Sequence, residues 1–375
     1  MTSVAIHVDQ LWFRAPGGIG TYVRNLVPAL AREDPALRIE LFHSRFPSRG
    51  LPERWLGDFG VQELPASPRS LYPRWALTGR PPLPISLSST DVLHATNPAA
   101  IPPAAPGQRL VVTVHDLAFE RFPEAFPRRW RTLYRLGLRA AVRRADAILT
   151  PSRSTAEDIL SRTKVDQARL HVVPLAASLE KGALDPGDVL PRLKIRAPYV
   201  LFVGTLEPRK NLVRLVRAYR RVAATGVPHA LVLAGPLGWH TNALMREITL
   251  HGLGDIVLTG PISAEDLDAV YRAADVFVYP SLHEGFGLPV LEAMSRGVPA
   301  VASNTSSIPE VAGDAAVGVN PRSVREIASA IELVLTDTDL AERLAARGRA
   351  RVERFSWSET ARLTLGVYEE VTGRK

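Results

Sequence analysis

The sequence contains no cysteine among its 375 residues. A disulfide framework and a thiolate metal site are therefore both excluded, which fits a protein kept in a reducing compartment. No apolar run approaches the roughly 18 residues that a membrane-spanning helix needs. The first residues, MTSVAIHVDQLWF, also lack the basic stretch of a secretory signal. These absences predict a cytoplasmic protein.

Acidic residues are in the minority. The chain has 46 lysines and arginines against 38 aspartates and glutamates, which gives a formal net charge of +8. Such a balance favours anionic partners, namely phosphates, a membrane surface or nucleic acid. Much of the excess is local, because residues 121–144 contain eight arginines and a single acid, Glu124.

The basic segment over residues 121–144 reads as a helix after Pro127, with Trp130, Leu133 and Leu138 toward one side and the arginines mostly elsewhere. Two interpretations stay open. The arginines form an ordinary solvated helix face, or they meet anionic lipid or a phosphate-bearing ligand. Aromatic residues are too few there to stack nucleic-acid bases, so we expect no specific nucleic-acid partner.

Length and rhythm both predict two domains. A chain of 375 residues exceeds the size at which one core usually keeps growing. Strand-like apolar runs alternate with amphipathic helical patterns in each half, and this alternation is typical of a doubly wound parallel sheet. The alternation of strand and helix patterns is interrupted between Ala176 and Pro198, a stretch rich in glycine and proline. This stretch is therefore the expected linker.

The predicted fold is therefore α/β, with two tandem Rossmann-like doubly wound domains that face a ligand-binding cleft. The expected domains are residues 1–185 and 186–355. Residues 356–375 form a last helix, opened by the capping pair Ser356 and Glu359, which we expect to pack back on the first domain. Residues 44–90 show little periodicity, so a long functional loop region is expected there.

Two features of the first domain mark ligand-binding positions. A strand over Val4–Val8 is followed by Gly17, Gly18 and Gly20 and then by a helical pattern, as at the opening of a βαβ unit. The spacing is not GxGxxG, so we read this loop as a phosphate or sugar contact, with a plain tight turn as the alternative. His115 ends a later strand, where open sheets bind ligands, although a histidine there can also be purely structural.

The stretch YPSLHEGFGLPVLEAMSRGVPAVAS, residues 279–303, reads as a strand end, a loop, a short helix and a second strand. Glu284 lies in the loop, and Glu292 falls on the helix. The loop glycines let the backbone approach a ligand, and the free N–H groups where the helix begins suit an anion such as a diphosphate. For Glu292 alone, the alternative is a helix that carries an acid in its early turns because of the macrodipole.

The loop after the first strand of the second domain reads GTLEPRKN and contains Gly204, Arg209 and Lys210. The planar fork of arginine and the point charge of lysine lie where a strand ends and a helix begins. This combination suits a diphosphate leaving group.

Five motifs together resemble one family. They are GGIGTYVRNL near the start, HDLAFERFPEAF in the middle, GTLEPRKN and HEGFGLPVLEAMSRGVPAVASNTSSIPEVAGDAA in the second half, and FSWSETA near the end. They resemble glycosyltransferase family 4, whose members are retaining enzymes with the GT-B fold. The segments HDLAFERFPEAF and SNTSSIPEVAGDAA are similar to those of bacterial mannosyltransferases. The resemblance covers nearly the whole chain, except residues 44–90.

The resemblance implies a role for the charged positions that match. Arg209 and Lys210 would hold the donor diphosphate and neutralise it as it leaves. Glu284 would lie beside the donor sugar and its phosphate, and Glu292 would accept from the ribose hydroxyls. With His115 beside the sugar ring, the expected catalytic residues are His115, Glu284, Arg209 and Lys210.

The resemblance also implies backbone contacts with the donor. The backbones of Phe286, Gly287 and Leu288 would contact the transferred sugar and the phosphates. Gly204 is expected from its own loop, and not from the resemblance, to lie with Arg209 and Lys210 on the positive floor of the site. Gly17 and Gly18 would lie under the diphosphate. The first domain would then be the acceptor side and the second the donor side.

The implied activity is transfer of a hexose, mannose by preference, from a nucleotide diphosphate sugar such as GDP-mannose to a polysaccharide or lipid-linked oligosaccharide. UDP-glucose and dTDP-rhamnose are the alternative donors. The family resemblance implies no cofactor, no metal ion and a front-side attack. It fits a protein at the inner face of the cell membrane. Sugar-nucleotide epimerases of the same fold, and a basic membrane-binding or nucleic-acid-binding protein without catalysis, are the competing readings.

Overall fold

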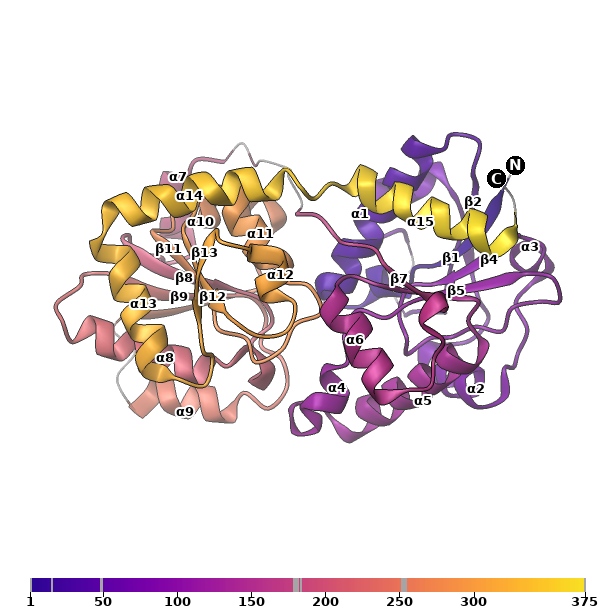
Figure 1. The fold of residues 1–375 in the computed structure, drawn as a ribbon, viewed down its shortest axis with the longest axis horizontal. Coiled ribbons are helices and arrows are strands. Elements are labelled where there is room, and N and C mark those ends of the chain that lie inside the picture. Colours follow the sequence, from indigo (N-terminus) through magenta and orange to yellow (C-terminus); the bar gives the residue numbers. More distant parts are fainter. Residues whose placement is uncertain are drawn as a thin grey trace. The chain divides into compact units, whose positions relative to one another are not determined.

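A computed structural model of the chain describes residues 2–14, 16–47, 50–177, 182, 184–250 and 255–373. Contacts divide it into two compact units, one of Met1–Leu175 with Ser356–Lys375 and the other of Ala176–Phe355. The division therefore falls earlier than residue 185, where the sequence placed it. Each unit is a parallel sheet with helices packed around it (Figure 1).

The first unit contains a seven-stranded sheet in the order β3-β2-β1-β4-β5-β6-β7. Its strands are β1 (Ser3–His7), β2 (Arg38–His43), β3 (Gly60–Glu63), β4 (Val92–Ala95), β5 (Arg109–Thr113), β6 (Ala147–Thr150) and β7 (Leu170–Val172). Its helices are α1 (Gly17–Glu33), α2 (Pro68–Thr78), α3 (Ile85–Ser88), α4 (Ala118–Arg121), α5 (Arg128–Arg144), α6 (Arg153–Arg162) and α15 (Trp357–Thr372), with short 3-10 turns η1 (Asp9–Trp12), η2 (Arg54–Asp58), η3 (Pro123–Ala125) and η4 (Gln167–Arg169).

The second unit contains a six-stranded sheet in the order β10-β9-β8-β11-β12-β13. Its strands are β8 (Tyr199–Val203), β9 (Ala230–Ala234), β10 (Ile256–Gly260), β11 (Val276–Tyr279), β12 (Ala300–Ser303) and β13 (Ala316–Val319). Its helices are α7 (Pro186–Arg192), α8 (Leu212–Ala223), α9 (Asn242–Leu250), α10 (Ala264–Arg272), α11 (Leu288–Ser295), α12 (Ile308–Ala312), α13 (Val324–Thr336) and α14 (Thr338–Val352), with the 3-10 turn η5 (Pro208–Lys210).

Every strand pair in both sheets is parallel. The central strands are covered by helices on both faces, and for this reason they consist of near-continuous apolar runs rather than alternating ones. All five residues of β8, YVLFV, are buried, as are the four of β11, VFVY. The predicted α/β fold with two doubly wound parallel sheets is therefore confirmed.

The prediction of a long loop over residues 44–90 is wrong for much of that stretch, which contains η2, β3, α2 and α3. Helix α2 buries Leu71, Tyr72 and Trp75 on one side. Its prolines hid the pattern, although Pro68 stands in the first turn, where proline is well tolerated. Strand β3 has only four residues and pairs with β2 alone, so its sequence signal is weak.

Helix α15 completes the first unit by packing against α1. The Tyr368 hydroxyl forms a 2.7 Å hydrogen bond with Nδ1 of the buried His94, whose Nε2 lies 2.8 Å from the Thr113 hydroxyl. Burial lowers the pKa of His94 to about 3, so the imidazole is neutral. Ser356 caps the helix by accepting from the Glu359 N–H, as the sequence predicted.

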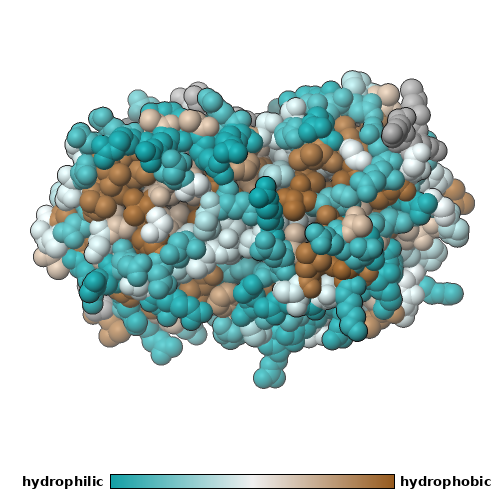
Figure 2. All heavy atoms as spheres, viewed as in Figure 1, coloured by the Kyte–Doolittle hydropathy of each residue, from teal (hydrophilic) through white to brown (hydrophobic). Residues whose placement is uncertain are grey.

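None of the described helices is long and apolar enough to cross a membrane. Figure 2 shows one face of the molecule, on which hydrophilic residues are widespread and apolar residues gather in separate patches. Such a mixture is ordinary for the surface of a folded protein.

Candidate active site

The strand order of the second unit reverses between β8 and β11, which are neighbours in the sheet although β9 and β10 separate them in the chain. Ligands of open α/β sheets bind at the carboxyl ends of the strands at such a reversal. The loop after β8 carries Arg209 and Lys210, and the loop after β11 carries Glu284. The topology thus brings the two sequence motifs to one place.

Glu284 forms ion pairs with both cations. Its Oε2 accepts from Arg209 Nη1 at 2.8 Å, and its Oε1 accepts from Lys210 Nζ at 2.7 Å. The other arm of Arg209 donates to Glu207 Oε1 at 2.8 Å. Glu284 and Lys210 are only 6% and 7% exposed, so these charges attract one another with little screening by water.

The charges within this cluster set its protonation. Burial by itself would raise the pKa of Glu284, but the neighbouring Arg209 and Lys210 lower it to about 2. Burial lowers the pKa of Lys210, and the Glu284 carboxylate opposes this effect. At neutral pH Glu284 is therefore an anion that already engages two cations.

Asn211 ties the two loops together. Its backbone is left-handed, with φ of 62°, which asparagine tolerates better than most residues. Its side-chain amide donates to the carbonyl oxygens of Pro280 and Pro321, at 3.0 and 2.6 Å. Arg209 is fixed as well, because its Nη1 also donates to the His283 carbonyl at 2.8 Å. The cations are thus held in place by backbone contacts as well as by charge.

Two serines after β12 support the Glu284 loop. Ser306 Oγ accepts from the Glu284 N–H at 3.0 Å, and Ser307 Oγ donates to the carbonyls of Glu284 and Phe286 at 3.0 and 2.8 Å. Phe286 and Leu288 are themselves buried. Backbone contacts between these residues and the donor stay a prediction.

Two glycines are required by geometry. Gly287 precedes α11 with φ of +113°, and a Cβ there would lie 2.6 Å from Ile308 Cδ1. Gly204 follows β8 with φ of +147°, and a Cβ there would lie 3.3 Å from Phe202 Cζ. Only glycine adopts these backbone conformations freely, so both turns depend on it.

Glu292 does not belong to the ion-paired cluster. It lies on α11 and accepts from the Tyr271 hydroxyl at 2.9 Å. Burial raises its pKa, while the Tyr271 hydrogen bond and the charge of Arg296 act in the opposite direction. The structure therefore places the two glutamates of residues 279–303 in different surroundings.

The sequence predicted that Gly17 and Gly18 lie in a loop before the first helix. In the structure they lie instead in the first turn of α1. A helix leaves its first N–H groups without intrahelical partners, so these glycines still offer free donors. A Cβ at either position would meet no atom within 4 Å. Room for a ligand next to this backbone is therefore available within the first unit.

His115 follows β5, and its Nε2 donates to the Thr96 carbonyl at 2.9 Å. Its ring stands edge-on to Tyr22 of α1, with centroids 5.0 Å apart. Burial lowers the pKa of His115, so the neutral ring carries its proton on Nε2 and offers Nδ1 as an acceptor. Asp116 is engaged elsewhere, since its Oδ1 accepts from the Ala118 N–H at 2.9 Å.

The described residues contain no group of three or more histidines, aspartates or glutamates that could hold a metal ion. Two Asp-x-Asp pairs do occur. Asp266 and Asp268 form ion pairs with arginines, and Asp337 caps α14 with Asp339 in its first turn. Independence of metal stays a prediction, as do the roles assigned to each site residue and the cleft between the domains.

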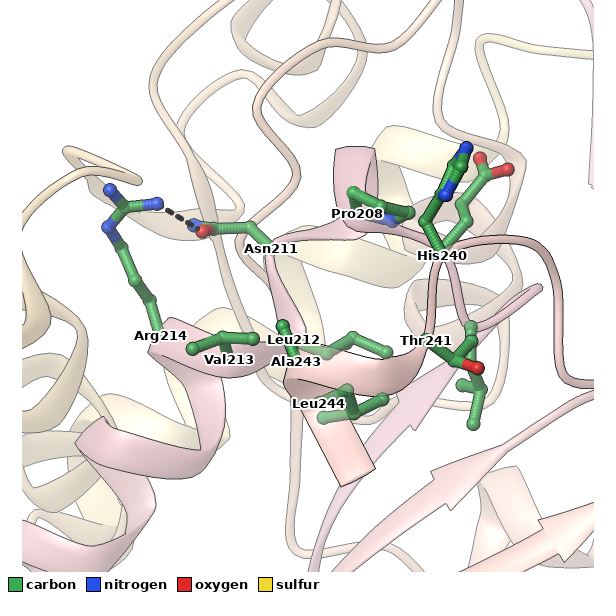
Figure 3. Close-up of a pocket in the computed structure, with 11 residues that line it drawn as sticks. Pro208, Asn211, Leu212, Val213, Arg214, His240, Thr241, Ala243 and Leu244 are labelled. Carbon is green, nitrogen blue, oxygen red and sulfur yellow. Dashed lines mark hydrogen bonds between the residues drawn. The ribbon is translucent and has the colours of Figure 1, made fainter. Parts of the chain in front are cut away.

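A small pocket of about 150 Å³ lies beside the loop after β8, lined by Glu207, Pro208, Asn211 and residues at the starts of α8 and α9. Figure 3 shows the Arg214 guanidinium turned toward Asn211, whose Oδ1 accepts from it at 2.9 Å. Pockets that bind drug-sized ligands usually have volumes of roughly 300–1,000 Å³. The volume of this pocket is below that range.

Some contacts of the cluster could not be read from the sequence. The sequence shows Glu207 within GTLEPRKN and Tyr279 at the end of a strand, but neither pattern indicates a partner for the side chain. Tyr279 ends β11, and its hydroxyl accepts from Lys210 Nζ at 2.6 Å. The only signal was position, because both residues stand at carboxyl ends of adjacent strands.

Comparison with known proteins gives this geometry a family. The model described as "Glycosyltransferase Family 4" matches residues 16–181, and that described as "Glycosyl transferases group 1" matches residues 192–351. The chain is 36% identical over 268 residues to the O-antigen chain mannosyltransferase B of Escherichia coli, which covers 70% of each chain. It is 34% identical over 284 residues to the MMP alpha-(1->4)-mannosyltransferase of Mycolicibacterium hassiacum, covering 72% of this chain and 67% of the relative.

Solved structures agree on the fold. The sucrose-phosphate synthase of Thermosynechococcus elongatus superimposes with a TM-score of 0.79 at 22% identity, over the full length of both chains. The lipopolysaccharide glycosyltransferase WaaG gives a TM-score of 0.72 at 15% identity, again over both whole chains. Because the family models lie on both parallel-sheet units and a relative matches at 36% identity, the chain belongs to glycosyltransferase family 4 and is a glycosyltransferase with the GT-B fold.

Proposed function

We propose that this enzyme transfers a hexose, mannose by preference, from a nucleotide diphosphate sugar to a polysaccharide or lipid-linked oligosaccharide, with retention of configuration and without a metal ion. GDP-mannose is the proposed donor. The observation that carries the proposal is the cluster of Arg209, Lys210 and Glu284 at the strand-order reversal of the second unit. The choice of mannose is supported by relatives that are named as mannosyltransferases.

The cluster suits a leaving diphosphate. Arg209 offers a planar pair of donors and Lys210 a compact positive charge, both held in position before any ligand arrives. Preorganised donors stabilise charge that develops in the transition state more than mobile ones do. In this proposal the diphosphate takes over donors that Glu207 and Glu284 otherwise engage, and the cations neutralise it as it departs.

Retention is proposed to occur by front-side attack. The acceptor hydroxyl forms the new bond to the anomeric carbon while the bond to the phosphate oxygen breaks, and the departing phosphate takes the hydroxyl proton. A double displacement would need a carboxylate nucleophile. Glu284 is a poor one because both oxygens are ion-paired, and Asp116 Oδ1 already accepts from the Ala118 N–H. The neutral Nδ1 of His115 is proposed to accept from a sugar hydroxyl.

A donor screen tests the proposal. The protein would be incubated with GDP-mannose, UDP-glucose and dTDP-rhamnose, and release of each nucleoside diphosphate would be measured by mass spectrometry, since even slow hydrolysis reports the donor. We expect release of GDP, and thermal stabilisation by GDP of about 2.7 kcal/mol at a hundredfold excess over Kd. Turnover of UDP-glucose or dTDP-rhamnose instead would show that mannose is not the transferred sugar. No turnover with any of the three donors would contradict the proposal.

The anionic membrane surface is the second proposed partner. On α5, Arg128, Arg129, Arg139 and Arg143 are exposed, and their spacing places them within about 100° of the helix circumference. The apolar side of the helix, including Leu138 and Ala141, is buried in the first unit. The helix thus turns a basic face outward, as a helix that lies on anionic lipid does.

Other arginines of residues 121–144 have structural partners. Arg121 is paired with Asp158 and Arg135 with Glu120. Arg144 donates to the carbonyl oxygens of Trp75 and Pro102. These arginines stabilise the first unit, so a test of membrane binding should leave them unchanged.

Replacing Arg128, Arg139 and Arg143 by glutamate is expected to lower the affinity for phosphatidylglycerol vesicles by more than about a hundredfold at low salt, as measured by co-sedimentation. The reason is that each arginine near such a surface contributes roughly 1 kcal/mol. The matched control replaces the exposed Arg322, Arg325 and Arg343 of the second unit. Equal sedimentation of both triple variants, or no binding by the unchanged protein, would show that the basic face of α5 is a solvated helix surface that does not bind anionic lipid.

A further inference from the structure

Tyr271 connects α10 to the Glu292 carboxylate on α11. Its side chain is 1% exposed, and its hydroxyl donates to Glu292 Oε2 at 2.9 Å. A buried hydroxyl that donates to a carboxylate forms one of the stronger kinds of hydrogen bond, because the acceptor carries charge. The orientation of Glu292 therefore depends on a residue from a different helix.

A buried ion pair holds Tyr271 in place. The Arg296 guanidinium lies over the Tyr271 ring, 5.7 Å from its centroid. Arg296 Nε donates to Oδ1 of Asp268 at 3.0 Å, and Oδ2 of the same carboxylate accepts from Arg272 Nε at 2.8 Å. Asp268 is 1% exposed. Because Asp268 and Tyr271 are both on α10, this pair fixes α10 and α11 to one another around Tyr271.

The two oxygens of Glu292 are unlike one another. Oε2 is engaged by Tyr271, whereas no hydrogen bond to Oε1 is found within the part of the chain that the structure describes. The side chain is partly exposed. Glu292 thus has one oxygen that is held in place and one that is available to a ligand.

Several groups act on the pKa of Glu292, which is raised on balance. Burial raises its pKa, which would favour the neutral acid, while the Tyr271 hydrogen bond and the Arg296 charge favour the anion. A carboxylate accepts from hydroxyls on both oxygens, whereas a protonated acid loses part of that capacity. Tyr271 therefore contributes to the charge as well as to the direction of the acceptor.

We propose that Tyr271 is a positioning residue, fixed by Arg296 and Asp268, that turns the available oxygen of Glu292 toward the vicinal hydroxyls of the nucleoside in the donor. This inference rests on the proposed function and on the role that the family resemblance implies for Glu292 as the ribose contact. It goes beyond that function by assigning a task to three residues outside the ligand contacts. Without the Tyr271 hydroxyl, the carboxylate is free to turn toward the nearby Arg296.

The test uses Tyr271→Phe with two pairs of probes, GDP and 2′,3′-dideoxy-GDP, and UDP and 2′,3′-dideoxy-UDP, in titration calorimetry. The unchanged protein is expected to bind one of the ribose forms better than its dideoxy partner. Tyr271→Phe is expected to weaken that ribose form by about tenfold and to leave the affinity for the dideoxy form unchanged. In transfer assays, KM for the donor should rise while kcat changes little.

Tyr199→Phe is the matched control, since the buried Tyr199 hydroxyl donates to the Val270 carbonyl next to Tyr271. It should lower stability but keep the preference of the unchanged protein for the ribose form over the dideoxy form. An equal loss for both forms in Tyr271→Phe, or no loss, would overturn the inference while the proposed function stands. Failure of the unchanged protein to distinguish ribose from dideoxy forms would do the same. If the unchanged protein bound none of the four nucleotides, both the inference and the proposed function would be overturned.

Discussion

Replacing Lys210 by methionine is expected to lower kcat for sugar transfer by about 10²- to 10³-fold, as loss of one preorganised charge-stabilising group does in other enzymes. Methionine keeps most of the length of the lysine side chain and removes its charge. Lys210 Nζ is fixed between the Tyr279 hydroxyl and Glu284 Oε1, at 2.6 and 2.7 Å. A cation held in this position is already placed to neutralise the departing diphosphate.

The measurement is the initial rate of nucleoside diphosphate release at saturating donor. Saturation separates the effect on the chemical step from weaker donor binding. Arg325→Met is the matched control, because Arg325 is exposed on α13 of the same unit, and its kcat should stay within twofold of the unchanged enzyme. A rate for Lys210→Met within threefold of the unchanged enzyme would show that Lys210 does not neutralise the leaving group.

The grouping of Arg209, Lys210 and Glu284 could be anticipated from the sequence. Each stands just after a strand whose apolar run is easily recognised, and parallel sheets gather such positions at one edge. The sequence could not say that β8 and β11 are adjacent, because strand order follows from tertiary packing of the helices. It also could not show the partners of the two glutamates: Glu284 pairs with two cations, and Glu292 accepts from a tyrosine.

Element boundaries were harder to predict where local propensity and tertiary structure disagree. Gly17 and Gly18 have low helix propensity, yet α1 begins at Gly17. Helix α2 contains Pro73 and begins at Pro68, so its sequence looks like a loop although Trp75 is buried in the core. In both cases packing of the helix against the sheet outweighs a local preference that a single sequence makes prominent.

Exchange of Glu284 for glutamine is expected to lower the free energy of unfolding of the second unit by about 3–5 kcal/mol, the usual cost of removing one partner from a buried ion pair. Glutamine has nearly the same shape, so the loss would come from charge. Arg209 keeps Glu207 as a partner, at 2.8 Å, but Lys210 keeps only the Tyr279 hydroxyl among the partners seen for its ammonium group. Burial of an uncompensated ammonium group accounts for most of the expected cost.

The same substitution should change how stability depends on pH. The Arg209 and Lys210 charges hold the pKa of Glu284 at about 2, below its ordinary value of 4.5. A carboxylate whose pKa is lowered on folding stabilises the protein fully above its unfolded pKa. This contribution is lost as the pH falls from about 4.5 toward about 2. Glu284→Gln should lack that part of the acid dependence.

Urea unfolding of the unchanged protein, Glu284→Gln and Glu342→Gln at neutral and acid pH tests both statements. Glu342 is an exposed glutamate on α14, so its variant should unfold like the unchanged protein. The double variant Glu284→Gln with Lys210→Met should lose less stability than the sum of the single changes, because it removes the uncompensated charge as well as its partner. Additive losses would mean that the two side chains do not stabilise one another, whatever their distance. Equal stability of Glu284→Gln and the unchanged protein would instead show that the ion pairs only balance the cost of burying their charges.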